Sequence, residues 1–370
     1  MRQFCLTFAM VASIGLAQDG PYKVQKTAKV GGDGGFDYVT ADAAGRRLYV
    51  GRSANPGRVT VFNLDTLEKV GEVPNTLRVH GATVSPKSKH GFASSNPVVM
   101  FDSKTLATIK TIDVKGNPDG YLYDPFNDRV YILSHSKPHA TAINAADGAI
   151  VGTIDDLGGA PEEAATDGKG TIYVDIEDAH SVAVVDAKTL TVKTHYDLGD
   201  KGDGCAGLAL DAKNEILFAA CRNPQNMVIL SATDGKILAA LPLAGGSDGA
   251  AFNPKTMEAF SSQGDGTLTV IKENSPTDFV VEQTVTTPVR AKTITLDTKT
   301  GHLLLITAEY GPAPAPPAPA AAPVAPPPAA APGAAPAEGG RPGGPGGPGG
   351  FRGPRAPMIP GSFEIVVVGK

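Results

Sequence analysis

Residues with ionisable side chains recur along the chain at a nearly constant spacing. The positions that share this spacing are Asp37, His80, Asp119, Glu162, Ala206, Asp248 and Lys292. Successive members are 43, 39, 43, 44, 42 and 44 residues apart, and all of them except Ala206 are ionisable. If the fold gathers these positions, their oxygen atoms suit a hard divalent cation or another cationic ligand.

Five members of this set form a predicted metal site: Asp37, His80, Asp119, Glu162 and Asp248. A single histidine among carboxylates favours calcium or magnesium over zinc, which prefers several nitrogen or sulfur ligands. Clustered carboxylates also raise one another's pKa values, which could provide a general acid or base. The alternative is a wet channel in which acidic residues at strand starts bond only to local backbone groups.

A second set of positions follows the same period. Its members are Arg52, Asn96, His135, Glu177, Arg222, Gln263 and Glu309. Arg52, His135 and Arg222 join the ionisable residues of the first set, Lys292 included, as predicted ligand-binding residues. The arginines could recognise an anionic substrate, or they are ordinary exposed arginines. The sequence holds no nucleophile elbow, HExxH, Walker A or dinucleotide motif in a suitable context, so no catalytic residue is predicted.

The elements that must position these residues are short strands in a repeat. Five residues after each position of the first set stands a turn residue: Asp42, Ser85, Asp124, Asp167, Asp211, Asn253 and Asp297. Each copy has a strand before this turn, a strand after it, and two further strands, such as 59–63 and 68–73. Apolar residues alternate with period two, and no long helical period follows the N-terminal segment. Seven copies of four antiparallel strands predict an all-β, seven-bladed β-propeller.

The seventh copy is split between the two ends of the chain. It begins at Arg290, breaks off after Tyr310 and resumes at 363–368, where its fourth strand is missing. The unassigned strand 22–30 supplies that fourth strand if the N-terminal strand pairs with the C-terminal one. Such pairing closes the ring and hides the sheet edges that an open array would expose.

Composition divides the chain into segments. Residues 1–17 are expected to be a cleaved signal peptide, with an uncleaved anchor as the alternative, so we expect a periplasmic or secreted protein. Residues 18–310 hold the blades, and 362–370 complete blade 7. Residues 311–361 are rich in Pro, Ala and Gly and are expected to be disordered.

Charge and hydropathy limit the partners. A formal net charge of −5 gives no basic field for nucleic acid. No segment after the signal is long and apolar enough to span a membrane. We also expect the protein to be a monomer.

Two cysteines remain after the expected cleavage, Cys205 and Cys221. They flank a hairpin that turns at 211–215, so they fall opposite each other. Because an exported protein meets an oxidising compartment, a cross-strand disulfide is predicted, with two free thiols as the alternative.

The repeat units resemble those of the YVTN-repeat, YncE-like β-propellers. The resembling units are 42–50 with 59–63, and 167–174 with 182–186. No copy carries Tyr-Val-Thr-Asn in full. The resemblance implies an exported seven-bladed propeller, usually without an assigned reaction, in a wider class that includes lactone hydrolases.

Two functions are consistent with these features. The first is a non-catalytic scaffold that binds a ligand or a protein through the channel face, with no cofactor or with a divalent cation. The second is a metal-dependent, lactonase-type hydrolase that uses the ring of carboxylates and histidine.

Overall fold

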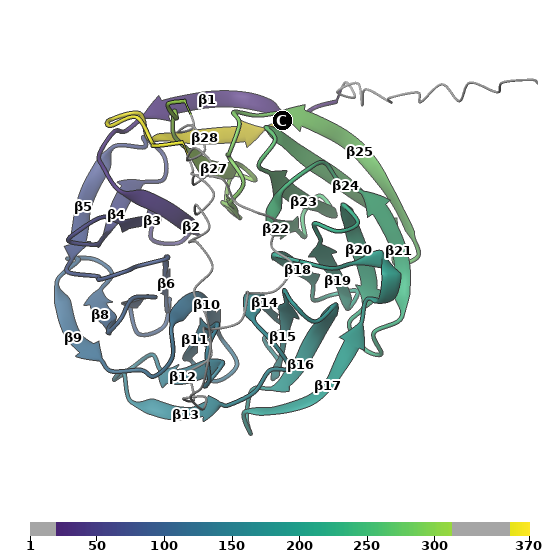
Figure 1. Ribbon diagram of the computed structural model, residues 1–370, viewed down its shortest axis with the longest axis horizontal. Helices are drawn as coiled ribbons and strands as arrows, with labels where there is room; N and C mark the ends of the chain where they lie inside the picture. Colours follow the sequence, from purple (N-terminus) through teal and green to yellow (C-terminus); the bar gives the residue numbers. More distant parts are fainter. Residues whose placement is uncertain (1–19, 313–355) are drawn as a thin grey trace, which may run out of the picture. The chain divides into compact units, whose positions relative to one another are not determined.

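The computed structural model of the protein describes residues 20–312 and 356–370. Seven antiparallel sheets of four strands each stand in a ring, with one edge of every sheet at the centre (Figure 1). The predicted all-β, seven-bladed β-propeller is confirmed.

Blades 1 to 3 follow one another along the chain. Blade 1 consists of β2 (Gly35–Asp42), β3 (Arg47–Ser53), β4 (Arg58–Asn63) and β5 (Lys69–Pro74). Blade 2 consists of β6 (Ala82–Val84), β7 (His90–Ala93), β8 (Val98–Asp102) and β9 (Thr108–Ile112). Blade 3 consists of β10 (Pro118–Asp124), β11 (Arg129–Ser134), β12 (Ala140–Asn144) and β13 (Ile150–Ile154).

Blades 4 to 6 have the same strand order. Blade 4 consists of β14 (Pro161–Thr166), β15 (Thr171–Ile176), β16 (Ser181–Asp186) and β17 (Thr191–Asp197). Blade 5 consists of β18 (Gly207–Asp211), β19 (Ile216–Ala220), β20 (Asn226–Ser231) and β21 (Ile237–Pro242). Blade 6 consists of β22 (Ser247–Asn253), β23 (Glu258–Gln263), β24 (Thr267–Ser275) and β25 (Asp278–Thr286).

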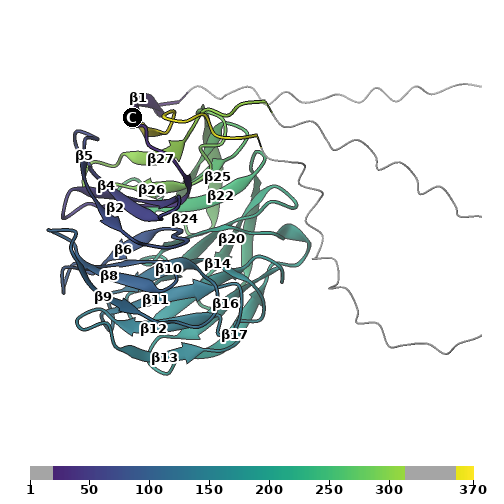
Figure 2. The ribbon, with the colours of Figure 1, turned by 60° about the vertical axis from the view of Figure 1, so that its left-hand side comes forward.

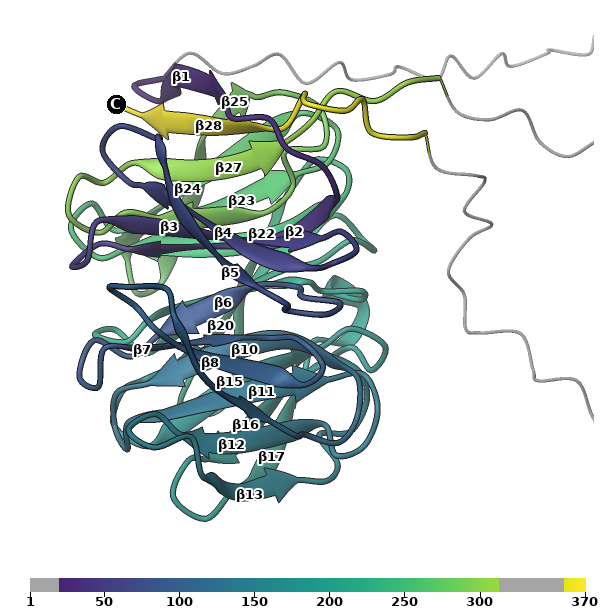
Figure 3. The same cartoon turned by 90° about the vertical axis from the view of Figure 1, so that its left-hand side faces the viewer.

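Blade 7 joins the two ends of the chain. It consists of β26 (Ile294–Leu296), β27 (Leu303–Thr307), β28 (Glu364–Gly369) and β1 (Lys23–Lys29). The pairing of β1 with β28 runs from Lys23 opposite Gly369 to Lys29 opposite Glu364. Figures 2 and 3 show the N-terminal strand in purple beside the C-terminal strand in yellow. The predicted ring closure is therefore present.

The turn residues act as their types predict. A side-chain oxygen of each accepts a hydrogen bond from a backbone N–H two or three residues further on, which holds the tight turn between the first two strands. This holds for Asp42, Ser85, Asp124, Asp167, Asp211, Asn253 and Asp297. The constant spacing of the sequence is thus the spacing of one turn per blade.

Apolar side chains pack between neighbouring blades. At the junction of blades 7 and 1, Val50, Phe62, Ile306, Phe363 and Ile365 lie in one cluster and are almost fully buried. Burying each of these side chains contributes roughly 1.5–3 kcal/mol. The closure of the ring is therefore held by its core as well as by strand pairing.

A disulfide joins Cys205, just before β18, to Cys221, just after β19. The two residues are separated by 16 positions and lie in the apolar core of blades 4 and 5. A link that closes a loop of this length restricts the unfolded chain.

Reducing this disulfide is expected to lower the free energy of unfolding by about 2–3 kcal/mol. Urea unfolding of the oxidised and reduced protein measures the difference. Mass spectrometry with and without reduction verifies the bond, and a reduced protein of unchanged mass and stability would show two free thiols.

Two segments predicted from composition fall wholly or mostly outside the described residues. The expected signal peptide, 1–17, lies outside them, and so does most of the Pro/Ala/Gly-rich insertion, 313–355. At the described ends of the insertion, Tyr310 pairs with Met358 in an isolated bridge. Over the described ranges, no helix has the length and hydropathy needed to cross a membrane.

Candidate functional site

The start of each inner strand brings one predicted residue toward the channel. Asp37, Asp119, Glu162 and Asp248 lie on β2, β10, β14 and β22, while His80 and Lys292 stand two residues before β6 and β26. Ion pairs connect them to neighbours from the loops after the second strands. The ion pairs form two chains, one from Asp37 to Glu162 through the histidines and one from Glu177 to Lys292 through Arg222 and Asp248. We call the two chains together the channel-face ring: Asp37, His80, Asp119, His135, Glu162, Glu177, Arg222, Asp248 and Lys292.

The four inner-strand carboxylates of this ring occupy irregular backbone. The pairing of inner and second strand shifts register across Asp37, Asp119, Glu162 and Asp248 alike. An extra residue in a strand redirects its side chain, and such bulges are common beside binding and active sites. The fold therefore turns the same position toward the channel in four blades.

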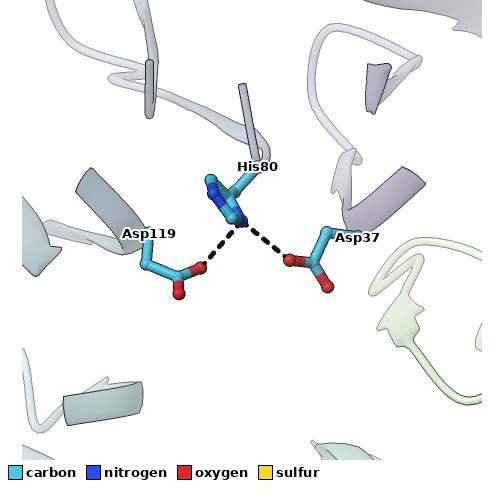
Figure 4. Close-up of side chains that lie close together, drawn as sticks. All are labelled: Asp37, His80 and Asp119. Atoms are coloured by element: carbon cyan, nitrogen blue, oxygen red, sulfur yellow. Dashed lines mark hydrogen bonds and ion pairs between the residues drawn. The ribbon is translucent and has the colours of Figure 1, made fainter. Parts of the chain in front are cut away.

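His80 lies between two carboxylates (Figure 4). Its Nδ1 is 2.8 Å from Asp37 Oδ2 and 3.0 Å from Asp119 Oδ1. Desolvation by burial lowers the pKa of the imidazole, but the hydrogen bonds and charges of Asp119 and Asp37 outweigh it and raise the pKa to about 10. In the metal-free protein His80 is therefore a cation at neutral pH.

His135 repeats this arrangement one blade further on. Its Nε2 is 3.1 Å from Glu162 Oε2 and 3.3 Å from Asp119 Oδ2. The hydrogen bond with Glu162 raises the pKa of His135 to about 9, despite partial desolvation. Asp119 thus offers one oxygen to each histidine, and the contacts of the two histidines together link blades 1 to 4.

The other part of the ring contains stronger bases. Arg222 forms ion pairs with Glu177 and Asp248, and Lys292 also pairs with Asp248. Burial raises the pKa of Asp248 even though Lys292 and Arg222 counteract it. Asp248 is therefore committed to two fixed cations and does not join the histidines.

Arg52 does not lie with the ring, although its position in the repeat predicted that it would. Its guanidinium donates hydrogen bonds to the backbone carbonyls of Asp33 and Gly34 and lies 3.9 Å from the centre of the Phe363 ring. The side chain is only 1% exposed. These contacts give Arg52 a structural role at the junction of blades 7 and 1.

The half-buried Glu163 and the fully buried Asp175 are acids next to the ring that the sequence did not indicate. Glu163 follows Glu162 and accepts a hydrogen bond from the backbone N–H of Leu208 at 2.9 Å, and Asp175 on β15 accepts one from the N–H of Glu163 at 2.6 Å. Desolvation raises the pKa of Glu163 to about 8 and the pKa of Asp175 well above its usual range. In the sequence, the only sign of a second acid at this place is the adjacent pair Glu162-Glu163. Neighbouring residues of a strand point to opposite faces, so the two glutamate side chains cannot point the same way.

A cavity of about 180 Å³ lies inside the channel next to these groups. Glu162 and Glu163 line it together with Tyr38, Thr40 and Tyr121. The Tyr121 hydroxyl lies 2.7 Å from Thr40 Oγ1, and the Tyr38 hydroxyl donates to the backbone carbonyl of Glu162 at 3.3 Å. The ring is thus continuous with an internal polar space.

No family model matches the chain, and no curated protein matches it by sequence. Solved structures do. A chain of the Kuenenia stuttgartiensis hydrazine synthase has a TM-score of 0.64 at 16% identity, over 75% of this chain and 94% of that one. A chain of the mitotic checkpoint complex has a TM-score of 0.65 at 11% identity, over 82% and 96%. The structure of U3-55K has a TM-score of 0.64 at 9% identity, over 77% and 90%.

These similarities identify the fold. The chain is a seven-bladed β-propeller. At such low identities the likeness carries no function, and membership of the YncE-like family stays a prediction.

The propeller places two groups of possible metal ligands close together. One is Asp37, His80 and Asp119, and the other is Asp119, His135 and Glu162, with the ligand atoms of each group within 4.8 Å of one another. The predicted metal set thus gains His135, while Asp248 lies in neither group. Two imidazoles replace the single histidine on which the preference for calcium or magnesium depended.

Both ring histidines are expected to be protonated at pH 7.5 in metal-free protein, and Asp119→Asn is expected to lower the pKa of both. Losing the shared carboxylate removes an ion-pair partner from each imidazole. NMR titration of the imidazole signals in the presence of a chelator measures the two pKa values. Values near 6.5 in the unaltered protein would contradict the ion pairs described here.

Proposed function

We propose that the propeller is a binding protein that holds a cationic group, of a small molecule or of a protein partner, at the channel-face ring. The observation that carries this proposal is the repeated register shift, which aims a carboxylate into the channel from four different blades. A fold that needed only to close its ring would not require four such departures from regular pairing. Redirected side chains of one charge at one place favour a ligand of the opposite charge.

The charge of the ring supports a cationic ligand. Carboxylates outnumber basic groups by one when both imidazoles are protonated, and by three when both are neutral. The carboxylates are Asp37, Asp119, Glu162, Glu177 and Asp248, and the basic groups are His80, His135, Arg222 and Lys292. An arriving cation that releases the imidazole protons therefore meets a site with excess negative charge.

Spermidine and lysine methyl ester are suitable amine probes. Each is expected to raise the Tm of the protein by at least about 3 °C at saturating concentration, because a ligand that binds only the folded state stabilises it. Asp119→Asn is expected to abolish the shift. Asp147→Asn, the same change on the exposed β12–β13 turn, is the matched control and should retain it. Equal shifts in both variants would place the binding elsewhere.

Hydrolysis of a lactone is the second candidate, and the internal cavity favours it. Glu163 lines that cavity beside Glu162 and within the same space as two tyrosine hydroxyls. A carboxyl group in such a site can transfer a proton to or from a bound ester. Turnover of a lactone panel that disappears in Glu163→Gln would support this reaction, and the absence of any turnover by the unaltered protein would exclude it for that panel.

We further propose that the protein is exported and belongs with the YncE-like propellers. The apolar segment 4–16 followed by small residues and the buried Cys205–Cys221 disulfide support an oxidising compartment. N-terminal sequencing of the protein recovered from the periplasm or medium tests this. A cytosolic protein that retains residue 1 would contradict it.

A further inference from the structure

Two imidazole nitrogens in the ring each face a pair of carboxylate oxygens. Figure 4 shows His80 Nδ1 directed at Asp37 and at Asp119, at 2.8 and 3.0 Å. His135 Nε2 faces Glu162 and the other oxygen of Asp119, at 3.1 and 3.3 Å. The five side chains therefore form two three-donor groups that share one carboxylate.

A proton cannot satisfy either group fully. An imidazole nitrogen carries at most one hydrogen, and a strong hydrogen bond requires that hydrogen to point at a single acceptor. One of the two carboxylate oxygens at each nitrogen is therefore left with a poorly aligned contact. A metal ion placed among the three donors interacts with all of them at once.

The separations of the donor atoms suit a first-row divalent ion. Zinc bonds to nitrogen and oxygen at about 2.0–2.2 Å, so neighbouring donors lie about 2.8–3.1 Å apart at right angles and about 3.3–3.6 Å apart in a tetrahedron. The four nitrogen–oxygen distances here, 2.8 to 3.3 Å, match the right-angled spacing and reach the lower end of the tetrahedral one. Imidazole with carboxylate suits zinc and its first-row neighbours, whereas calcium takes oxygen ligands in larger number.

We propose that the channel-face ring binds two zinc-class divalent ions bridged by Asp119. His80 and Asp37 complete the first site, and His135 and Glu162 complete the second. Each ion keeps at least one coordination position for water or ligand, because each group supplies only three protein donors. The inference rests on the proposal that the ring binds cations and specifies which cation. It replaces the sequence-based expectation of calcium or magnesium.

Calorimetric titration of chelator-treated protein with Zn²⁺ tests the metal site. Two zinc ions per chain are expected, with Ca²⁺ binding at least about 100-fold more weakly. Asp119→Asn is expected to weaken both sites about 100-fold, since it removes a ligand from each. His135→Gln should remove one ion and leave the other. His302→Gln, outside the ring, is the matched histidine control and should bind as the unaltered protein does.

Circular dichroism and Tm of each variant verify that it is folded, and His135→Gln changes a half-exposed side chain, so the test does not depend on Asp119→Asn alone. A stoichiometry below two, zinc binding unaffected by the ring variants, or tighter binding of Ca²⁺ would overturn the inference. If the amine probes bind through Asp119 while zinc does not, only the metal inference fails. If neither class binds at the ring, the proposed function fails as well.

Discussion

Deleting residues 362–370 is expected to abolish cooperative folding of the propeller. This change removes β28, which pairs with both β27 and β1. It also removes Phe363, Ile365, Val366 and Val368, each of which is fully buried. Loss of one large buried side chain costs about 2–5 kcal/mol, and a whole domain is stable by only about 5–15 kcal/mol. Thermal unfolding followed by circular dichroism is the measurement.

Deleting residues 313–355 provides the matched control. This segment of Pro, Ala and Gly lies outside the described residues, and its composition offers little apolar surface to bury. We expect the Tm to change by no more than about 3 °C, because shortening a connecting loop has a small effect on stability. A short deletion at the C-terminus that left the Tm unchanged would contradict the closure of blade 7.

Glu163→Gln is expected to stabilise the protein at pH 8.5 by about 2–4 kcal/mol and to have little effect at pH 4. The carboxyl group of Glu163 loses its proton near its ordinary pKa in the unfolded chain but near pH 8 in the folded one. The folded state therefore binds more protons between these values, and stability falls as pH rises through that window. Glutamine keeps the shape of the protonated acid and cannot ionise, so the variant should lose this part of the pH dependence.

Urea unfolding of both proteins at several pH values, with a chelator present, measures this effect. Asp175 also has a raised pKa and stays in the variant, so part of the slope should remain. Equal stability of the two proteins at pH 8.5, or a less stable variant, would show that Glu163 ionises as freely in the folded state as in the unfolded one.

The blade count and strand order were predictable because they depend on local chemistry. Asp, Asn or Ser recurs at each first turn, and apolar residues alternate in the strands on both sides. The split seventh blade was predictable from the same period. The C-terminal strand at 363–368 has no following strand to pair with, and the N-terminal strand at 22–30 has no preceding one, so the two ends can pair with each other.

The pairing of side chains within the ring was not predictable. The spacing predicted equivalent points for Asp37, His80 and Asp119, but a register shift decides where the two aspartates are aimed, and His80 stands before its strand. His135 lies on a loop after β11, so its approach to Glu162 depends on the path of that loop, which the repeat spacing does not specify. Arg52 occupies the equivalent position of blade 1 but lies within β3, and its guanidinium donates hydrogen bonds to backbone carbonyls inside the protein.

The proposed site of two divalent ions bridged by Asp119 can be seen directly. An anomalous difference map at the zinc edge, from crystals grown with Zn²⁺, is the measurement. Two peaks are expected on either side of Asp119, one next to His80 Nδ1 and one next to His135 Nε2. Zinc found only at histidines outside the ring, such as His139, with no peak beside Asp119, would contradict the two-metal site.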